Sequence, residues 1–354
     1  MALQLDHYRL LGRSGLRVSP LALGTMTFGA GPGWGSTDED AARIIDAYLD
    51  RGGNFIDTAN FYGQMGGSEA LLGRLLADRR ERLVLATKYT LTTRPGDPNA
   101  SGNQRKNMVR SVEASLKRLG AEYIDLLYLH MWDFRTPVEE ILRAFDDLVR
   151  QGKILYAGLS DTPAWQGARM QAIADLRGWS PFVALQISYS LIERTVEREL
   201  IPMAREMGMG VLPWSPLGGG VLSGKYTLED LHSAQSGALA SRKAINVATG
   251  RLSARNLAIA TVVGEVAREI GRTPAQVALA WTLLNPAVAS PIIGARTPSQ
   301  FEDNLGALDV SFTDEQIERL GSASHVELGF PHDMLSAPTN ATAFGGVQVE
   351  RPTR

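Results

Sequence analysis

The stretch YIDLLYLHMWDFRTPVEEILRAFDDLVRQGKILYAGLS, residues 123–160, contains a complete strand–helix–strand unit. Its two ends, 123–130 and 154–160, are short apolar runs rich in residues that favour strands. The segment between them, 138–152, has apolar residues at helical spacing. Since alternating strands and helices indicate parallel pairing, this stretch predicts a parallel sheet covered by helices.

The same alternation extends over most of the chain. Apolar runs of strand length recur eight times, at residues 21–26, 54–59, 83–88, 123–130, 154–160, 182–188, 210–215 and 289–295. Amphipathic segments lie between them, such as 38–52, where Ile44, Ile45 and Tyr48 recur at helical spacing. Eight such units without a break in composition predict closure into a (β/α)8 TIM barrel. An open, doubly wound sheet is the alternative.

Polar residues mark the expected ends of the helices. Thr37 and Ser68 stand directly before acidic residues and are predicted to cap two helix N-termini. Gly52, Gly120 and Gly152 stand where helices should end.

The residues beyond a minimal barrel of about 250 residues fall in three places. These are a predicted N-terminal hairpin at 8–19, a connection at 217–255 after the seventh strand, and a C-terminal tail at 322–354. We predict one domain over residues 1–354, with the barrel itself at 20–321. Insertions of this kind usually shape a pocket.

The composition excludes several classes of protein. The chain has 354 residues, a formal net charge of −2 and no cysteine. The low net charge gives no electrostatic basis for binding nucleic acid or an anionic membrane, and the missing cysteine excludes disulfides and thiolate nucleophiles. Asp6, His7 and Arg9 interrupt any N-terminal secretory signal, and no segment approaches about 18 successive apolar residues. We expect a cytoplasmic protein.

Ionisable residues follow three successive predicted strands. Asp57, Lys88 and His130 end the second, third and fourth strands, and Tyr62 lies in the loop after the second. Because the C-terminal strand ends of a parallel barrel meet at one face, these four side chains should converge. Their chemistry suits delivery of a proton to a carbonyl oxygen that gains charge as hydride reaches the carbon.

Each of the four residues has a distinct expected role. Tyr62 is the proton donor, and its ordinary pKa of about 10 should be lowered by the Lys88 ammonium. Asp57 should hold Lys88 in place, and His130 should direct the substrate oxygen. Taken singly, Asp57 and Lys88 could form a structural ion pair, and His130 could be a core residue. Only their coincidence at consecutive strand ends favours catalysis.

The motifs GGNFIDTANFYG, ATK, YIDLLYLH, LQISYSLIER, WSPLGGGVLSGKY and IIGARTPSQFEDNL occur in this order. In order and spacing they resemble the aldo-keto reductase family, over about residues 8–321, and in particular the branch of bacterial members and potassium-channel β-subunits. The resemblance implies a barrel and an NADPH-dependent carbonyl reductase. It also implies that the family's catalytic Asp, Tyr, Lys and His match Asp57, Tyr62, Lys88 and His130.

The resemblance also implies a set of cofactor contacts. Ser160, Asp161 and Gln186 would bind the carboxamide, and Trp214 would stack on the nicotinamide. The remaining contacts would be a pyrophosphate belt at Ser215, Leu217, Gly219 and Lys225, and an adenosine site at Gly294, Arg296, Gln300, Asp303 and Asn304.

Some of these positions depart from the commoner family pattern. Asp161 replaces an asparagine, and an ionised carboxylate can only accept hydrogen bonds from a carboxamide. Gly294 and Gln300 replace two cations near the expected 2′-phosphate, which leaves Arg296 as its main contact. We therefore expect NADPH to be preferred, with NADH as a weaker cofactor.

The expected substrate wall is aromatic. It comprises Trp34, Met131 and Trp132, with side chains from the connection 217–255 and from the tail. Such a wall suggests an apolar or cyclic carbonyl compound, such as a xenobiotic or a secondary metabolite.

Parts of the sequence also fit other functions. The loop GAGPGWG, residues 29–35, resembles a Rossmann phosphate loop, but Trp34 stands where the third glycine belongs and Pro32 removes a backbone donor. Lys88 could instead form a Schiff base in a lyase. A regulatory channel subunit with slow turnover is a third possibility. A metal site is not expected, because the five histidines, His7, His130, His232, His325 and His332, lack ligand spacing.

Overall fold

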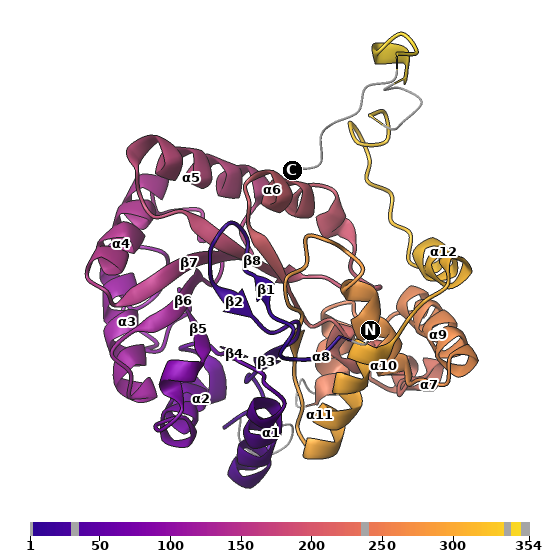
Figure 1. Cartoon of the computed structure of the whole chain (residues 1–354), viewed down its shortest axis with the longest axis horizontal. Coiled ribbons are helices and arrows are strands. Elements are labelled where there is room, and N and C mark those ends of the chain that lie inside the picture. Colours follow the sequence, from indigo (N-terminus) through magenta and orange to yellow (C-terminus); the bar gives the residue numbers. More distant parts are fainter. Residues whose placement is uncertain (1–2, 30–34, 235–240, 336–340, 348–354) are drawn as a thin grey trace.

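The computed structural model describes residues 3–29, 35–234, 241–335 and 341–347. An N-terminal hairpin is formed by β1 (Arg9–Leu10) and β2 (Arg17–Val18), which pair antiparallel. Gly12 at its turn lies against the backbone of Val183, at the start of β8, and of Gly208, just before β9, so the hairpin covers the N-terminal end of the barrel. Figure 1 shows it lying across the strands, and the predicted hairpin is confirmed.

Eight parallel strands form the main sheet in the order β10-β3-β4-β5-β6-β7-β8-β9. Their bounds are β3 (Ala22–Gly24), β4 (Phe55–Asp57), β5 (Val84–Tyr89), β6 (Ile124–Leu129), β7 (Ile154–Ser160), β8 (Phe182–Ser188), β9 (Gly210–Trp214) and β10 (Ile292–Ile293). A parallel bridge between Val211 and Val288 joins β9 to the segment before β10. This bridge nearly closes the sheet, as the predicted barrel requires, and excludes the open doubly wound sheet.

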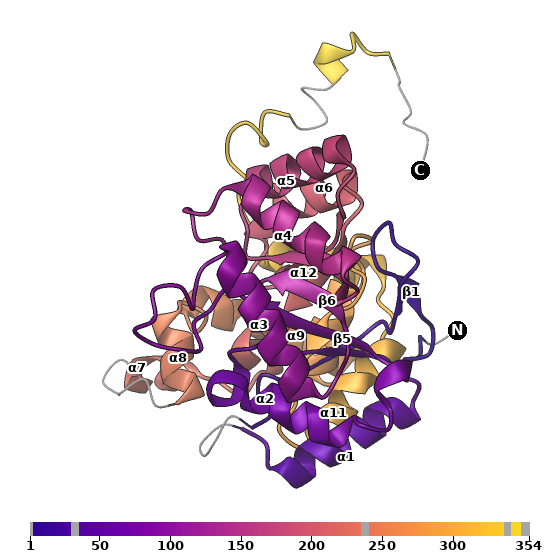
Figure 2. The ribbon, with the colours of Figure 1, turned by 90° about the vertical axis from the view of Figure 1, so that its left-hand side faces the viewer.

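Helices surround the strands, as Figures 1 and 2 show. They are α1 (Asp38–Asp50), α2 (Tyr62–Leu75), α3 (Arg105–Leu119), α4 (Val138–Arg150), α5 (Ala164–Arg177), α6 (Leu200–Glu206), α7 (Leu228–Ala234), α8 (Arg242–Ala248), α9 (Ala254–Glu269), α10 (Pro274–Thr282), α11 (Pro298–Leu305) and α12 (Asp314–Ala323). The described residues also contain four short 3-10 helices: η1 (Arg80–Arg82), η2 (Thr195–Glu197), η3 (Gly218–Ser223) and η4 (Gly306–Asp309).

Alternate strand residues pack into two separate hydrophobic clusters. One cluster mixes strand residues such as Ile56 and Leu127 with helix residues such as Phe145, so it is the layer between the sheet and the helices. The other contains residues of the strands, the hairpin and the segment before β10, including Phe55 and Tyr128, so it fills the barrel interior. Every second residue of a strand therefore points inward.

The predicted helix ends are partly confirmed. The Thr37 hydroxyl accepts a hydrogen bond from the Asp40 N–H and caps α1, and Gly120 is the left-handed C-cap of α3. The Ser68 hydroxyl does not act as the predicted cap: it donates to the Thr25 carbonyl, and no backbone N–H among the described residues donates to it. Residues 63–66, just before it, have positive φ values, so the regular turns of α2 begin only after them. A buried polar partner outside the helix thus competes successfully for that hydroxyl.

The two long insertions differ in position. The connection after β9 contains η3, α7 and α8, which lie beside the barrel mouth. Residues 325–332 instead follow the outer surface, where the His325 carbonyl accepts from Arg255 and the Phe330 carbonyl accepts from Arg198, and residues 341–347 lie beyond the barrel in both views. Within the described part of the chain, no helix is both long and apolar enough to cross a bilayer.

Candidate active site at the barrel mouth

Strand register brings the predicted catalytic residues to one face. Asp57 lies beside Ala86, and Lys88 lies beside Tyr128. Ala86 and Tyr128 belong to the interior cluster. Because side-chain direction repeats every two residues, Lys88 and His130 continue these inward-facing rows at the C-terminal end of the barrel.

Lys88 and Asp57 form a buried ion pair with further hydrogen bonds. The Lys88 Nζ donates to Asp57 Oδ1 at 2.6 Å and to the Thr58 carbonyl at 2.8 Å. The second carboxylate oxygen of Asp57 accepts from the Gln186 Nε2 at 2.8 Å. The side chain of Lys88 is 0% exposed and that of Asp57 is 3% exposed, so protein groups replace the water that both charges lose.

Tyr62 is held over this pair by an unusual turn. The next four residues, Gly63, Gln64, Met65 and Gly66, have positive φ values, although they lie within the bounds of α2. A side chain at Gly63 would place its Cβ 2.4 Å from the Ser68 nitrogen, so this turn requires glycine. The Lys88 Nζ lies 4.9 Å from the centre of the Tyr62 ring. The phenol therefore sits directly beside the ammonium.

Burial shifts the pKa values of these three groups. It raises the pKa of Tyr62, while the Lys88 charge opposes the rise. The net direction differs from the expected lowering because loss of solvation outweighs the ammonium. Burial also raises the pKa of Asp57 against the opposing effect of Lys88. For Lys88 burial favours the neutral amine, but Asp57 and Tyr62 outweigh it and raise the pKa. Lys88 is thus charged and Tyr62 is protonated near neutral pH.

His130 faces Tyr62 as a neutral imidazole. The two ring centres are 6.1 Å apart, and the rings are nearly perpendicular, at 82°. Burial and, to a smaller extent, the Lys88 charge lower the pKa of His130 to about 3. Its Nδ1 is buried and has no hydrogen-bond partner among the described residues. A neutral ring can donate one hydrogen bond to a ligand without adding charge.

A cavity of about 910 Å³ opens above these residues. Asp57, Tyr62 and His130 line it, and Lys88 lies beneath them. Each of the predicted cofactor residues also lines this cavity: Ser160, Asp161, Gln186, Trp214, Ser215, Leu217, Gly219, Lys225, Gly294, Arg296, Gln300, Asp303 and Asn304. The structure therefore brings together residues that are more than 200 positions apart in the sequence.

The end of the cavity nearest the catalytic residues is fixed by internal bonds. The Trp214 Nε1 donates to Asp161 Oδ1 at 3.1 Å, and the Arg251 guanidinium lies 5.2 Å from the Trp214 ring. Asp161 and Ser215 both have positive φ values, 39° and 51°, which are uncommon for residues other than glycine. Such backbone strain is concentrated at functional sites.

The glycines of η3 form a close-packed wall beside this end. Gly218, Gly219 and Gly220 all have positive φ values, of 58°, 68° and 90°. A Cβ at Gly219 would lie 2.3 Å from the Asn246 Oδ1, and the Asn246 Nδ2 donates to the Gly219 carbonyl at 3.0 Å. Only glycine fits here, and it leaves the backbone open to close approach by a ligand.

Cations gather in a second part of the cavity lining, formed by Lys225, Arg242 and Arg296, which we call the cationic end. Burial and then the neighbouring Arg296 and Arg242 lower the pKa of Lys225, and burial lowers the pKa of Arg242, with Arg251 and Arg296 contributing. Like charges this close to one another favour the approach of an anion. Arg242 and Tyr226 also line the cavity but were missed from the sequence, because they lie in the long connection after β9, outside the repeated strand–helix units. Only the basic pair Arg242–Lys243 could have indicated them.

The residues of the predicted adenosine site are held by α10 and α11. Gln300 accepts from the Arg296 N–H through its Oε1 at 3.0 Å, and Asn304 donates to the Gly294 carbonyl at 3.4 Å. The Asp303 carboxylate accepts from the Thr273 hydroxyl at 3.1 Å, so it also ties α11 to α10.

The predicted substrate residues are placed less uniformly. Trp34 lies outside the described residues. Met131 is 42% exposed and Trp132 is 8% exposed, and neither lines the cavity. No described residue of the tail lines it either. Three apolar residues that the sequence did not indicate do line the cavity: Met26, Phe61 and Leu91.

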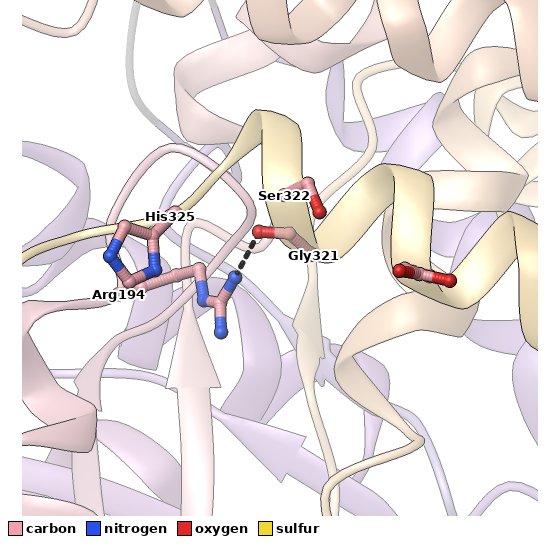
Figure 3. A pocket seen from close by; sticks show the side chains of 5 residues that line it. Arg194, Gly321, Ser322 and His325 are labelled. Carbon is pink, nitrogen blue, oxygen red and sulfur yellow. Dashed lines mark hydrogen bonds between the residues drawn. The ribbon is translucent and has the colours of Figure 1, made fainter.

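A second, open cavity lies at the C-terminal end of α12, lined by Arg194, Glu318, Gly321, Ser322 and His325. Figure 3 shows the Arg194 guanidinium directed at the Gly321 carbonyl, to which it donates at 2.9 Å. Arg194 is also paired with Glu197. This arginine is therefore committed to holding α12, and no chemistry is indicated there.

Comparison with known proteins identifies the relatives of this chain. The family model described as "Aldo/keto reductase family" matches residues 20–325. A norsolorinic acid reductase of Aspergillus flavus is 37% identical over 351 residues, 95% of this chain and 86% of the relative. The uncharacterized oxidoreductase YrpG of Bacillus subtilis is 41% identical, over 88% of this chain and 94% of the relative. The aryl-alcohol dehydrogenase GME11368 of Pestalotiopsis microspora is 36% identical, over 97% and 87%.

These matches cover the barrel strands, the cavity and both of its ends. Together with the fold and the arrangement of Asp57, Tyr62, Lys88 and His130, they assign the chain to a class of oxidoreductases. This protein belongs to the aldo/keto reductase family and is an oxidoreductase of the carbonyl and alcohol type.

Proposed function

We propose that the protein reduces an aldehyde or ketone to the alcohol with NADPH, with Tyr62 as the proton donor. The observation that carries the proposal is a protonated phenol, Tyr62, 4.9 Å above a buried ammonium, Lys88, at the bottom of a cavity. The family uses nicotinamide cofactors, which supply the hydride.

The residues around the cavity fit NADPH. Trp214, fixed by Asp161, offers a flat face for the nicotinamide, and the glycine wall at Gly218–Gly220 admits a pyrophosphate. Lys225, Arg242 and Arg296 repel one another, and a bound anion would relieve that repulsion. The 2′-phosphate adds two negative charges at neutral pH, so these cations favour NADPH over NADH.

The catalytic residues divide the work of proton transfer. Tyr62 holds the proton that the substrate oxygen receives, and its raised pKa keeps that proton in place until charge develops on the oxygen. The Lys88 ammonium then stabilises the phenolate that remains, and Asp57 and Thr58 keep Lys88 from moving. His130 is neutral and can donate a hydrogen bond that directs the oxygen towards Tyr62.

The state of Lys88 argues against a Schiff-base lyase. A lysine that attacks a carbonyl must be a neutral amine, which requires a lowered pKa. Here Asp57 and Tyr62 raise the pKa of Lys88, and its Nζ already donates to Asp57 and to the Thr58 carbonyl. The lysine is thus held as a cation.

The substrate class follows from the walls near Tyr62. Met26, Phe61, Leu91 and Trp214 give the cavity that Tyr62 lines an apolar surface, which suits a flat apolar or aromatic carbonyl compound. The relatives named norsolorinic acid reductase and aryl-alcohol dehydrogenase support an aromatic substrate for this chain as well.

The proposal is tested by following the absorbance of NADPH with a panel of aromatic aldehydes, cyclic ketones and multi-ring ketones. We expect steady consumption of NADPH, faster than of NADH, with aromatic compounds among the best substrates. Three results would contradict the proposal. These are no consumption with any carbonyl, a borohydride-trapped adduct on Lys88 without nicotinamide, or capture by a membrane channel without turnover.

A further inference from the structure

A strained residue connects two of the catalytic strands. Thr90 directly follows β5, two positions after Lys88, and its φ is +102°. It is the one β-branched residue among the non-glycine residues with positive φ that the structure describes. Because a branched Cβ makes this conformation costly, the surrounding contacts must hold it.

The Thr90 side chain bridges the catalytic strands to a buried asparagine. Thr90 is only 4% exposed, and its hydroxyl donates to the Asn103 Oδ1 at 2.8 Å. The same oxygen accepts a hydrogen bond from the His130 backbone N–H at 3.2 Å. Since the single hydroxyl proton is used for Asn103, a lone pair is left to face His130.

Asn103 is itself fixed from three directions. It is 0% exposed, its N–H donates to the Asp133 Oδ2 at 2.7 Å, and its carbonyl accepts from the Tyr89 hydroxyl at 3.2 Å. In addition, the Gly102 N–H donates to the Thr90 carbonyl at 2.8 Å. Thr90 is therefore clamped between the end of β5 and the segment that follows β6.

We propose that Thr90, with Asn103, is a positioning residue for the reaction: it sets the place of His130 relative to Tyr62. The His130 Nδ1 has no partner among the described residues, so its side chain is not anchored through that atom. The hydrogen bond from the His130 backbone N–H to the Thr90 hydroxyl instead fixes the backbone from which the imidazole projects. This inference rests on the proposed function, because it acts through His130.

The alternative is that the clamp only anchors the loop 91–103. A purely structural clamp would change the melting temperature but not the rate per folded molecule, and its effect would not depend on His130. A positioning residue must change kcat without changing cofactor affinity, and its effect must vanish once His130 is removed. The two roles therefore give different measurements.

The experiment compares Thr90→Val, which keeps the shape but lacks the hydroxyl, with Thr90→Ser, which keeps the hydroxyl. Thr90→Gly also lacks the hydroxyl but accepts a positive φ without strain, so it should fold. Thr92→Val is the matched control in the same loop, where the hydroxyl bonds only to Arg94 among the contacts that the structure gives. NADPH affinity is measured by quenching of tryptophan fluorescence, and kcat is measured with the best substrate of the panel.

We expect Thr90→Val and Thr90→Gly to lower kcat at least about 10-fold, because displacing a catalytic group by about 1 Å can cost about 100-fold. NADPH affinity should stay within about twofold, and Thr90→Ser should retain kcat within about threefold. In a His130→Ala background, Thr90→Val should lower kcat by less than about twofold.

Two results would overturn this inference alone in an active enzyme. One is an unchanged kcat in Thr90→Val and Thr90→Gly. The other is a loss that is as large in the His130→Ala background as in the wild type. A wild-type protein that reduces no carbonyl would overturn the proposed function, and this inference with it.

Discussion

The two ends of the cavity are built in different ways. At the catalytic end, Asp57, Lys88 and Gln186 lie on strands, are buried and are joined by hydrogen bonds of 2.6–2.8 Å. At the cationic end, Lys225 and Arg242 lie in the connection after β9, and Arg296 is exposed. The first end is thus fixed by internal hydrogen bonds, while the second presents positive charge to the cavity. The buried hydrogen bonds and the positive charges therefore lie in separate parts of one cavity.

The largest effect should come from removing the buried cation. Lys88→Met leaves Asp57 buried without its partner, which should lower the free energy of unfolding by about 3–5 kcal/mol. It also removes the charge that stabilises the Tyr62 phenolate, so kcat should fall about 100-fold or more. Chemical denaturation and steady-state kinetics measure the two effects. A variant as stable and as active as the wild type would show that the pair is dispensable.

The next largest effect is a loss of stability at acidic pH that comes from His130. Its pKa of about 3 in the folded state lies below the ordinary value of about 6.5, so the unfolded chain binds a proton that the folded chain does not. Stability should therefore fall as pH falls below about 6.5, by about 2 kcal/mol between pH 6.5 and 5 from this group. Chemical denaturation of the wild type and of His130→Asn at pH 6.5 and pH 5 isolates the contribution of His130 to this loss of stability. Equal pH dependence in both proteins would exclude a lowered pKa.

At the cationic end we expect smaller changes that affect binding alone. Arg296→Ala should weaken NADPH about 10-fold, or about 1.4 kcal/mol, and NADH by much less, with kcat unchanged. Because Arg296 is exposed, added salt should narrow the difference between wild type and variant. Arg43→Ala, an exposed arginine on α1, is the control. Equal losses for both cofactors would show that Arg296 does not contact the 2′-phosphate.

The smallest effect should come from Asp161→Asn, which restores the commoner family residue. Asparagine has nearly the same shape and can still accept from the Trp214 Nε1, so the orientation of the indole should persist. We expect NADPH affinity to change by less than about threefold, or about 0.6 kcal/mol. Fluorescence titration checks this. A loss of 10-fold or more would mean that the negative charge itself is required.

The same division explains what the sequence could predict. Lys88 and His130 stand at the ends of apolar runs whose period of two residues fixes their direction, so their meeting follows from the barrel alone. Gly218–Gly220 and Arg296 were expected only through the family resemblance. Arg242 and Tyr226 lie in an insertion without periodicity, and nothing local indicates that the chain returns to the cavity there.

Two properties needed the three-dimensional environment. The net rise in the pKa of Tyr62 depends on how much water the folded chain removes, which no local pattern of residues gives. The bond from His130 to Thr90 joins residues 40 positions apart through one hydroxyl, and Thr90 carries no sequence signal for its positive φ. Sequence patterns thus predict which side chains converge, whereas solvation and side-chain bonding decide their state.

The central claim is tested most directly by Tyr62→Phe, which removes one oxygen and keeps the ring. Tryptophan fluorescence should report unchanged NADPH affinity, while kcat for carbonyl reduction should fall by about 100- to 10,000-fold. Turnover equal to that of the wild type, with NADPH still bound, would contradict the assignment of Tyr62 as the proton donor.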